Sequence, residues 1–295
     1  MYLRIDKLPI EFPEPNGPSP NSAAAVQELL GGKYGEMSTL MNYTLQSFKF
    51  RGREKVRPFY DLIANIAAEE LSHIEVVSYT INLLLTGATT RGTDPSTAPL
   101  KNADGARNSY HFLASGQTAL PVDSMGNPWN GTFVHSSGNL KLDLLHNFFL
   151  ECGARANKMR VYEMVDDPAA RAAVGYLLVR GGVHVVAFAR ALEHFTGANL
   201  GKLFPIPDLS NKKFPEAAKL EAQGLHQIMF RFSPSDYGRI GEIWNGKHPE
   251  DGSELRVEDT IPAGFDPPTL AEEPQLNAPG IDPEFLQEAA KRLFR

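Results

Sequence analysis

A carboxylate and an imidazole interrupt the apolar face of a predicted helix. Glu70 and His73 lie three residues apart, in line with Ile63, Ile66 and Val77. Residues three or four apart share one face of an α-helix, and a buried carboxylate without a partner is costly in free energy. The pair therefore indicates either a solvated helix face or two side chains that bind a cation.

Three more predicted helices each place one ligand-type side chain in an apolar stripe. Glu36 lies between Leu29 and Leu40, and Glu151 and His184 occupy comparable positions later in the chain. Metal sites in helical bundles take their ligands from facing helices, and imidazole and carboxylate both bind transition metals. We therefore predict five metal ligands: Glu36, Glu70, His73, Glu151 and His184.

The ligand pattern departs from the usual di-iron arrangement at one position. That arrangement has a Glu on each helix and a Glu-x-x-His motif on two of them. Three residues before His184 the sequence has Gly181, so only three carboxylates accompany the two histidines. This departure weakens a di-iron assignment, although the ligand types alone do not choose between manganese and iron.

The elements that position these residues form an all-α fold. Long helices are predicted at about 23–48, 58–85, 139–164 and 168–195, from their apolar periodicity and their Asn, Pro and Gly boundaries. Residues 86–137 are rich in Gly, Pro and Ser, with a short helix near 107–115. Two helical hairpins joined by such a long crossover predict a ferritin-like four-helix bundle.

Three regions follow from this organisation. Residues 1–20 contain five prolines and predict an extended N-terminal arm. Residues 21–200 hold the bundle and its two-metal site. Residues 201–295 are predicted to form a proline-rich, irregular C-terminal extension with short helices near 216–223 and 283–293. We expect this extension to pack on neighbouring subunits.

Composition narrows the class of protein. The formal net charge is -6 and the pI is about 5.8, which argues against nucleic acid or an anionic membrane as a partner. The single cysteine, Cys152, favours a reducing compartment, and we expect a cytoplasmic protein. We predict that the N-terminus is not a signal peptide and that no apolar segment reaches the length of a membrane span.

Four sequence strings resemble the non-haem manganese catalases, and the similarity extends over residues 1 to about 245. The strings are LGGKYGEMSTLMNY at 30–43, AAEELSHIE at 67–75, HNFFLE at 146–151 and YLLVRGGVH at 176–184. The resemblance implies that Glu70 bridges two manganese ions, with Glu36 and His73 on one side and Glu151 and His184 on the other. Oxo, hydroxo or aqua bridges complete the cluster.

The same resemblance implies an activity and an assembly. The activity is disproportionation of hydrogen peroxide to water and dioxygen, with the metal pair cycling between divalent and trivalent states. The assembly is a homohexamer, and some relatives bind calcium at a subunit interface that Asp61 could join. Our hypothesis for Gly181 is that the missing carboxylate raises the reduction potential of the cluster.

Several other residues have predicted roles outside the ligand set. Tyr43 and Lys158 lie two turns after Glu36 and Glu151, so we predict them beside the cluster, the alternatives being a core tyrosine and a lysine that reaches solvent. We predict that Cys152 fills space in the core. The remaining residues are predicted to be solvated, paired or structural: Glu69, Glu75, His111, His135, His146, His194, His226 and His248.

Two alternative functions remain open at this point. A di-iron carboxylate oxidase or ferroxidase would use the same ligand types, but such activity normally draws on a fourth carboxylate. A structural bundle, such as a spore-coat component, would keep the fold without catalysis. A damaged ligand set would favour that second alternative, and none of the five predicted ligands is missing.

Overall fold

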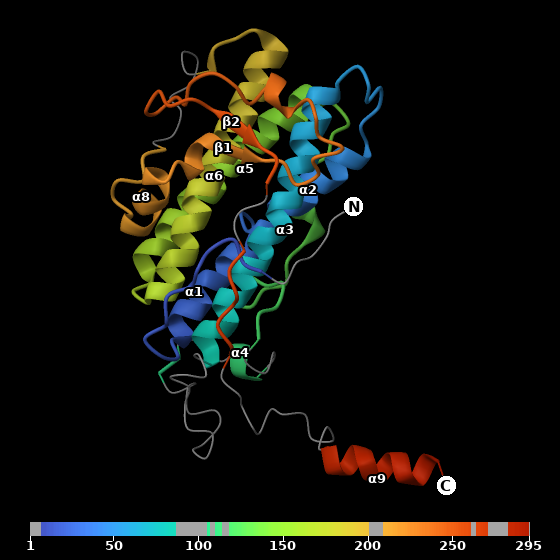
Figure 1. Ribbon diagram of the computed structural model, residues 1–295, viewed down its shortest axis with the longest axis vertical. Helices are drawn as coiled ribbons and strands as arrows, with labels where there is room; N and C mark the ends of the chain where they lie inside the picture. Colours follow the sequence, from blue (N-terminus) through green and yellow to red (C-terminus); the bar gives the residue numbers. More distant parts are fainter. Residues whose placement is uncertain are drawn as a thin grey trace.

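Long antiparallel helices form the body of the molecule (Figure 1). The computed structural model describes residues 7–86, 105–106, 110–113, 118–200, 209–260, 264–270 and 283–294. The long helices are α1 (Pro20–Gly31), α2 (Glu36–Phe48), α3 (Arg57–Thr86), α5 (Leu140–Met164) and α6 (Pro168–Thr196). α1 and α2 together pack along α3, and α5 packs along α6, which confirms the predicted ferritin-like bundle.

The first helix is broken, and the prediction of one continuous helix over 23–48 is wrong. Gly32 and Gly35 have extended backbone conformations, and residues 32–35 separate α1 from α2. A Cβ at Gly35 would lie 2.7 Å from the carbonyl oxygen of Leu30, so the chain passes itself too closely for a larger residue. The break makes Glu36 the first residue of α2, where the helix dipole favours a negative side chain.

The other helix boundaries agree with the sequence signals. The Asn139 side chain accepts hydrogen bonds from the first backbone amides of α5, and Asp167 does the same for α6, which starts at Pro168. Gly197 ends α6 in the left-handed conformation with φ of 71°. These caps fix where α5 and α6 begin, and therefore which of their faces turns inward.

The described part of the crossover lies against α1 and α2. Gln27 Nε2 donates to the carbonyl of Leu120 at 2.7 Å, and Gln46 Nε2 donates to the carbonyl of His135 at 2.9 Å. This part contains α4 (Tyr110–Leu113) and η2 (Gly131–Phe133). The short helix predicted near 107–115 is confirmed in α4, and its flanks lie outside the described residues.

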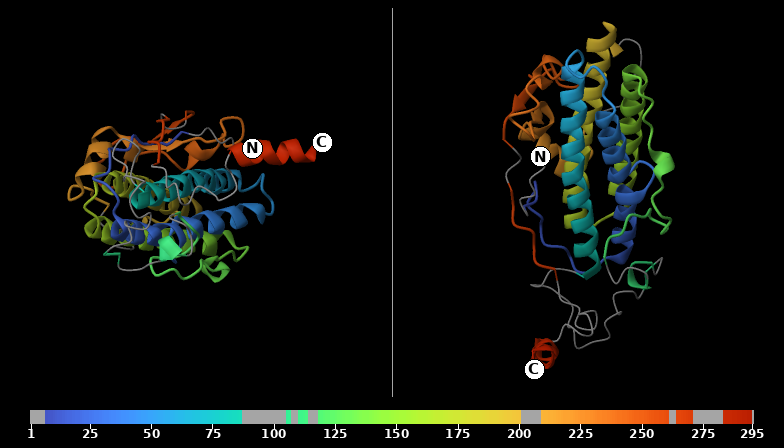
Figure 2. Two further views of the ribbon diagram at one scale, coloured as in Figure 1. Left: turned by 90° about the horizontal axis from the view of Figure 1, so that it is seen from below. Right: turned by 90° about the vertical axis from the view of Figure 1, so that its right-hand side faces the viewer.

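The C-terminal extension folds onto the bundle of its own chain over residues 209–260. It contains α8 (Pro215–Ala222), η3 (Leu225–Gln227), β1 (Ile228–Phe230), η4 (Ile240–Glu242) and β2 (Arg256–Glu258). β1 and β2 form a parallel pair that the sequence analysis did not predict, and α8 and η3 contact α6. Packing on neighbouring subunits stays a prediction for the rest of the extension, including α9 (Pro283–Leu293), which stands apart from the bundle (Figure 2).

α6 corrects one sequence interpretation. It has 29 residues and is long and apolar enough to cross a membrane, contrary to the prediction that no segment reaches that length. Its most apolar window is 94% buried inside the fold, however, and the helix carries Arg180 and His184. Its hydrophobicity is that of a core helix enclosed by its neighbours.

Candidate metal centre

The five predicted ligands meet in the interior of the bundle. Glu36 comes from α2, Glu70 and His73 from α3, Glu151 from α5 and His184 from α6. None of the five side chains is more than 1% exposed. The predicted inward stripes of four helices therefore converge on one place.

Glu70 lies between the two histidines. Its Oε2 atom is 3.1 Å from His73 Nδ1 and accepts a hydrogen bond from Thr39 Oγ1 at 3.0 Å. Its Oε1 atom is 2.8 Å from His184 Nδ1. The two oxygens of one carboxylate thus face two different imidazoles, so Glu70 is the side chain that could contribute a ligand atom to each half of a two-metal site.

The two halves of the centre are built alike. Glu36 Oε2 lies 3.4 Å from His73 Nδ1, and Glu151 Oε1 lies 3.4 Å from His184 Nδ1. The two imidazole rings stack with their centroids 5.4 Å apart. Each half therefore offers one histidine nitrogen and one terminal carboxylate, with Glu70 shared between them.

Several buried ligand atoms of the centre make no hydrogen bond within the described residues, although Glu36 Oε1 is in ion-pair contact with Lys158 and His184 Nδ1 lies close to Glu70 Oε1. They are both carboxylate oxygens of Glu36, Glu151 Oε2 and His184 Nδ1. Buried polar atoms without partners are rare in folded proteins, and groups of them commonly mark ion sites. Carboxylate oxygens and imidazole nitrogens suit manganese or iron, so the residues fit a metal cluster.

The carboxylates of the centre give it excess negative charge, which shifts the pKa values of its side chains. Burial alone would raise the pKa of Glu36, but Lys158 and His73 lower it below its usual range. Burial and the charge of Glu36 raise the pKa of Glu70. Burial opposes the protonation of His73, yet Glu70 and Glu36 raise its pKa to about 9. In the metal-free protein, protons on imidazole supply positive charge that divalent ions would otherwise bring.

Tyr43 and Lys158 both lie beside the predicted ligands. The Tyr43 hydroxyl donates to Glu151 Oε1 at 2.6 Å, and burial together with the charge of Glu151 raises its pKa well above the usual value. Lys158 Nζ is 2.9 Å from Glu36 Oε1, and its side chain is 2% exposed. The alternative of a lysine that reaches solvent is therefore excluded.

Gly181 faces Lys158. A Cβ at this glycine would lie 3.4 Å from Lys158 Nζ and 3.9 Å from its Cδ. The place where the di-iron pattern would project a fourth carboxylate is therefore next to a lysine ammonium group. A buried cation paired with Glu36 takes the position that an additional anion would need.

Comparison with known proteins places this arrangement in a family. A model described as manganese containing catalase matches residues 1–294. The chain belongs to the manganese-containing catalase family. A manganese catalase of Bacillus subtilis (strain 168) is 31% identical over 239 residues, which are 80% of this chain and 83% of that protein.

The chain is also similar to further manganese catalases. A manganese catalase of Lactiplantibacillus plantarum is 28% identical over 247 residues, covering 83% of this chain and 87% of that protein. The crystal structure of KatB, a manganese catalase from Anabaena, matches with a TM-score of 0.56 and 22% identity, covering 88% of this chain and 99% of that chain. At this identity the structural match supports the fold.

Glu69, predicted to be solvated or paired with neighbours, is paired. It is fully buried, and its Oε2 atom lies 3.2 Å from His184 Nε2, the ring nitrogen opposite the one that faces Glu70. Arg180 holds the carboxylate in place, with Nε 2.5 Å from Oε1 and Nη2 3.1 Å from Oε2. A hydrogen bond at the far nitrogen fixes the tautomer and orientation of a metal-binding histidine.

Arg180 lies next to the predicted centre but was not predicted from the sequence. Its Nη1 donates to the carbonyl oxygens of Leu225 and Ile228, both at 2.8 Å. One guanidinium group thus connects the C-terminal extension, through Glu69, to His184. The string 176–184 contains Arg180, but its distance from any predicted ligand line gave no reason to choose it.

The remaining candidates have structural roles or partners of other kinds. Asp61 accepts from Arg57 Nε at 2.6 Å and from the backbone amide of Arg239 at 3.0 Å, so its two oxygens are already bonded and calcium there stays a prediction. Cys152 is partly buried and packs against the core, as predicted, and burial raises its pKa to about 11. His146 bonds Asn42, which agrees with a structural role.

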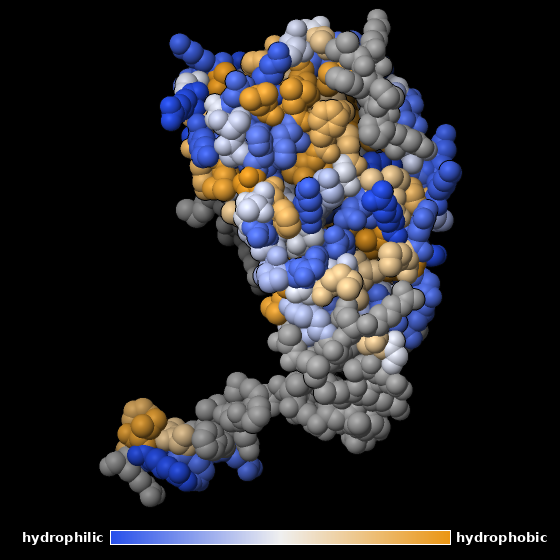
Figure 3. All heavy atoms as spheres, turned by 180° about the vertical axis from the view of Figure 1, so that it is seen from behind, coloured by the Kyte–Doolittle hydropathy of each residue, from blue (hydrophilic) through white to orange (hydrophobic). Residues whose placement is uncertain are grey.

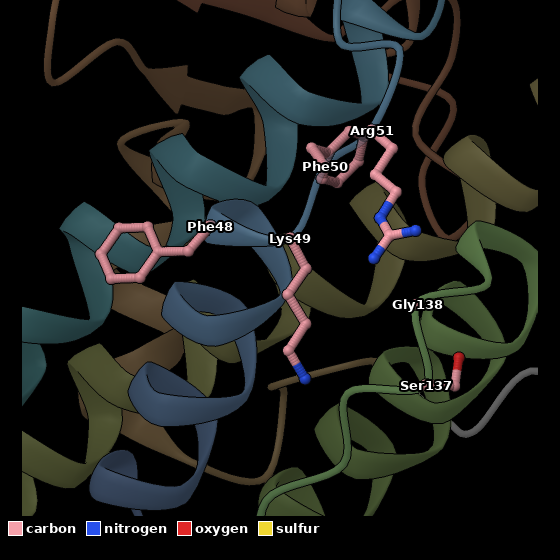
Figure 4. Close-up of a pocket in the computed structure, with 6 residues that line it drawn as sticks. All are labelled: Phe48, Lys49, Phe50, Arg51, Ser137 and Gly138. Atoms are coloured by element: carbon pink, nitrogen blue, oxygen red, sulfur yellow. The ribbon is translucent and has the colours of Figure 1, made fainter.

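A surface pocket lies away from the metal centre, at the end of α2 (Figure 4). It has a volume of about 620 Å³. Lys49 and Arg51 place two cationic groups beside it, and none of the predicted ligands lines it. The residues that line it are Phe48, Lys49, Phe50, Arg51, Ser137 and Gly138.

Proposed function

We propose that this protein is a manganese catalase that converts two molecules of hydrogen peroxide into two of water and one of dioxygen. The observation that carries the proposal is the pair of matched half-sites around Glu70, in a chain of the manganese-containing catalase family. Two bound manganese ions, with solvent bridges, would supply a two-electron couple that one peroxide oxidises and the next one reduces.

The protein side chains hold the cluster and its protons. Glu36 and His73 would bind one ion, Glu151 and His184 the other, and Glu70 both. Burial and the surrounding negative charge raise the pKa of Tyr43, so its hydroxyl stays protonated and donates a hydrogen bond to Glu151 Oε1. Glu151 is thereby held in one orientation through the reaction.

Lys158 supplies a fixed positive charge beside Glu36. Burial alone would lower its pKa, but the charges of Glu36, Glu151 and Glu70 raise it above the usual value, so the ammonium group stays protonated. A buried ammonium group at this distance can donate a hydrogen bond to a reacting oxygen atom and balance negative charge. The same lysine side chain occupies the space into which a fourth carboxylate from position 181 would extend in a di-iron site.

The proposal extends to assembly and compartment. Large apolar side chains remain exposed on the monomer, including Phe48, Leu142 and Phe149, and Figure 3 shows hydrophobic side chains gathered on the upper part of one face. Leu142 and Phe149 are seven residues apart on α5 and share a face. Such exposed faces support association of copies, and the number of six is carried over from the family resemblance. The single cysteine supports a cytoplasmic setting.

The test is metal content together with gas release. The protein is purified from cells supplied with manganese, its bound metals are quantified, and dioxygen is followed after addition of peroxide. We expect about two manganese ions per chain and rapid dioxygen release. Replacement of Glu70 by Gln is the matched control and should abolish both. Bound iron without dioxygen release would contradict the proposal.

A further inference from the structure

Three ligand-type side chains meet in the C-terminal extension, outside the catalytic centre. His226 lies in η3, and His248 and Asp251 lie in a turn further along the chain. One donor atom from each lies within 4.8 Å of the others. His226 Nε2 is 2.8 Å from Asp251 Oδ2, and His248 Nδ1 is 3.4 Å from Asp251 Oδ1. The sequence analysis found no ligand spacing here, because the two segments are distant in the chain.

The scaffold holds these donors in place. The turn is closed by a bridge between Lys247 and Glu254 and by a hydrogen bond of 2.7 Å from the His248 amide to the carbonyl of Ser253. Trp244 Nε1 donates to the carbonyls of Gln227 at 3.1 Å and Arg256 at 3.0 Å. This buried tryptophan therefore joins η3 to the segment that carries the turn.

The donor set suits a transition metal ion. His226 and His248 are 8% and 5% exposed, and their rings lie nearly perpendicular with centroids 5.0 Å apart. The Asp251 side chain is 45% exposed, which leaves a path for an ion and positions for water. Two imidazoles and one carboxylate with an open position form a common zinc ligand set.

A simple ion pair does not explain the whole cluster. A pair between His226 and Asp251 needs only one imidazole, yet a second buried imidazole faces the same carboxylate. The His248 nitrogen that faces Asp251 also accepts from the backbone amide of Glu250 at 3.3 Å, which orients that ring, whereas His226 Nδ1, on the other side of its ring, is buried without a hydrogen bond within the described residues. Asp251 Oδ1 also accepts from the amide of Ser253 at 3.0 Å, which keeps the carboxylate aimed at the two rings.

We propose that His226, His248 and Asp251 bind one divalent transition metal ion of the zinc type, separate from the catalytic pair. The ion joins η3 to the turn at 248–251. η3 begins at Leu225, whose carbonyl accepts from Arg180. The ion thereby stabilises the part of the extension that contacts the Glu69 and His184 network.

The experiment adds zinc chloride to the manganese-loaded, full-length protein. Unbound metal is removed by gel filtration, and zinc and manganese are counted per chain. We expect a gain of about one zinc ion per chain with manganese unchanged, and a higher melting temperature in zinc. Absence of zinc, or a gain of zinc that equals the loss of manganese, overturns the proposal.

Two ligand variants and one neighbour test the assignment. Asp251→Asn keeps an acceptor for Ser253, and His248→Asn removes one imidazole; both should lose the bound zinc and the zinc-dependent rise in melting temperature. Glu250→Gln alters an exposed side chain beside the site and should retain both. Manganese content shows that each variant is folded. Zinc retained by both ligand variants refutes the site.

Discussion

Glu69 and Glu70 are adjacent in sequence and have different roles. Glu70 lies between two imidazoles, whereas Glu69 is paired with Arg180 and bonds the far nitrogen of His184. Helical spacing identified Glu70, because it shares a line with His73. It could not identify Glu69, because the partner that keeps this carboxylate buried comes from another helix.

Glu69 is predicted to position His184. Replacing it with Gln weakens the hydrogen bond to His184 Nε2 and leaves Arg180 without its anion. We expect manganese affinity to fall by about 10- to 100-fold, as is typical for partners of metal-binding histidines. The measurement is manganese retention against a chelator. Glu75→Gln, on the same helix, is the control, and equal retention in both variants would refute the role.

Tyr43 is predicted to orient Glu151. Tyr43→Phe removes the hydroxyl that donates to Glu151 Oε1 and leaves a buried carboxylate oxygen with one partner fewer. We expect a loss of about 1–3 kcal/mol in the free energy of unfolding and a lower rate of dioxygen release. Denaturant unfolding and gas release measure the two effects. Wild-type values in both would show that the hydroxyl has no such role.

Gly181 is predicted to set the redox balance of the cluster. Gly181→Glu would place a carboxylate beside Lys158, compete with Glu36 for the ammonium group, and add an anion that favours the oxidised state. We expect slower turnover and a more oxidised resting state by electron paramagnetic resonance. Gly181→Ala, whose Cβ would make ordinary contact with Lys158, is the control. Unchanged turnover and resting state in the Glu variant contradict the hypothesis.

At the scale of elements, periodicity predicted the faces better than the breaks. The inward lines of α3, α5 and α6 were predictable because each apolar stripe is long, and because Asn139 and Asp167 cap the starts of α5 and α6. The break between α1 and α2 was not, since it depends on a close approach of Gly35 to Leu30 rather than on local preference alone. The β1 and β2 pair also escaped prediction, because each strand has three residues.

Gly35 is predicted to be essential for the start of α2. In Gly35→Ala the new Cβ would meet the Leu30 carbonyl oxygen at 2.7 Å, so the backbone must shift at the residue before Glu36. We expect a lower melting temperature and a reduced manganese content. Gly131→Ala is the matched control, because its Cβ would meet nothing within 4 Å. Equal melting temperatures and metal contents for the two variants would argue against this role.

At the scale of the whole molecule, metal binding and protonation compete for the same interior. The raised pKa of His73, about 9, means that its protonated form is favoured in the metal-free fold. This stabilisation is present below the unfolded value near 6.5 and is lost as the pH rises through about 9. A metal ion needs the neutral imidazole, so it must displace this proton.

Manganese affinity is therefore predicted to increase with pH. For each proton displaced, affinity should change by up to about tenfold per pH unit below the pKa of His73. Competition with a chelator at several pH values between neutrality and about 9 measures the slope, and a pH indicator measures proton release. An affinity independent of pH over this range would contradict the competition.

The contact of Arg180 with Leu225 and Ile228 also has a consequence for synthesis of the chain. All five predicted ligands precede these carbonyl groups in sequence, so a growing chain carries every ligand before it carries the acceptors that fix Arg180. During translation the five ligands are therefore complete before the carbonyl groups of Leu225 and Ile228, which hold Arg180, have been added. The contacts that Arg180 makes with the extension can therefore form only after Ile228 has been synthesised.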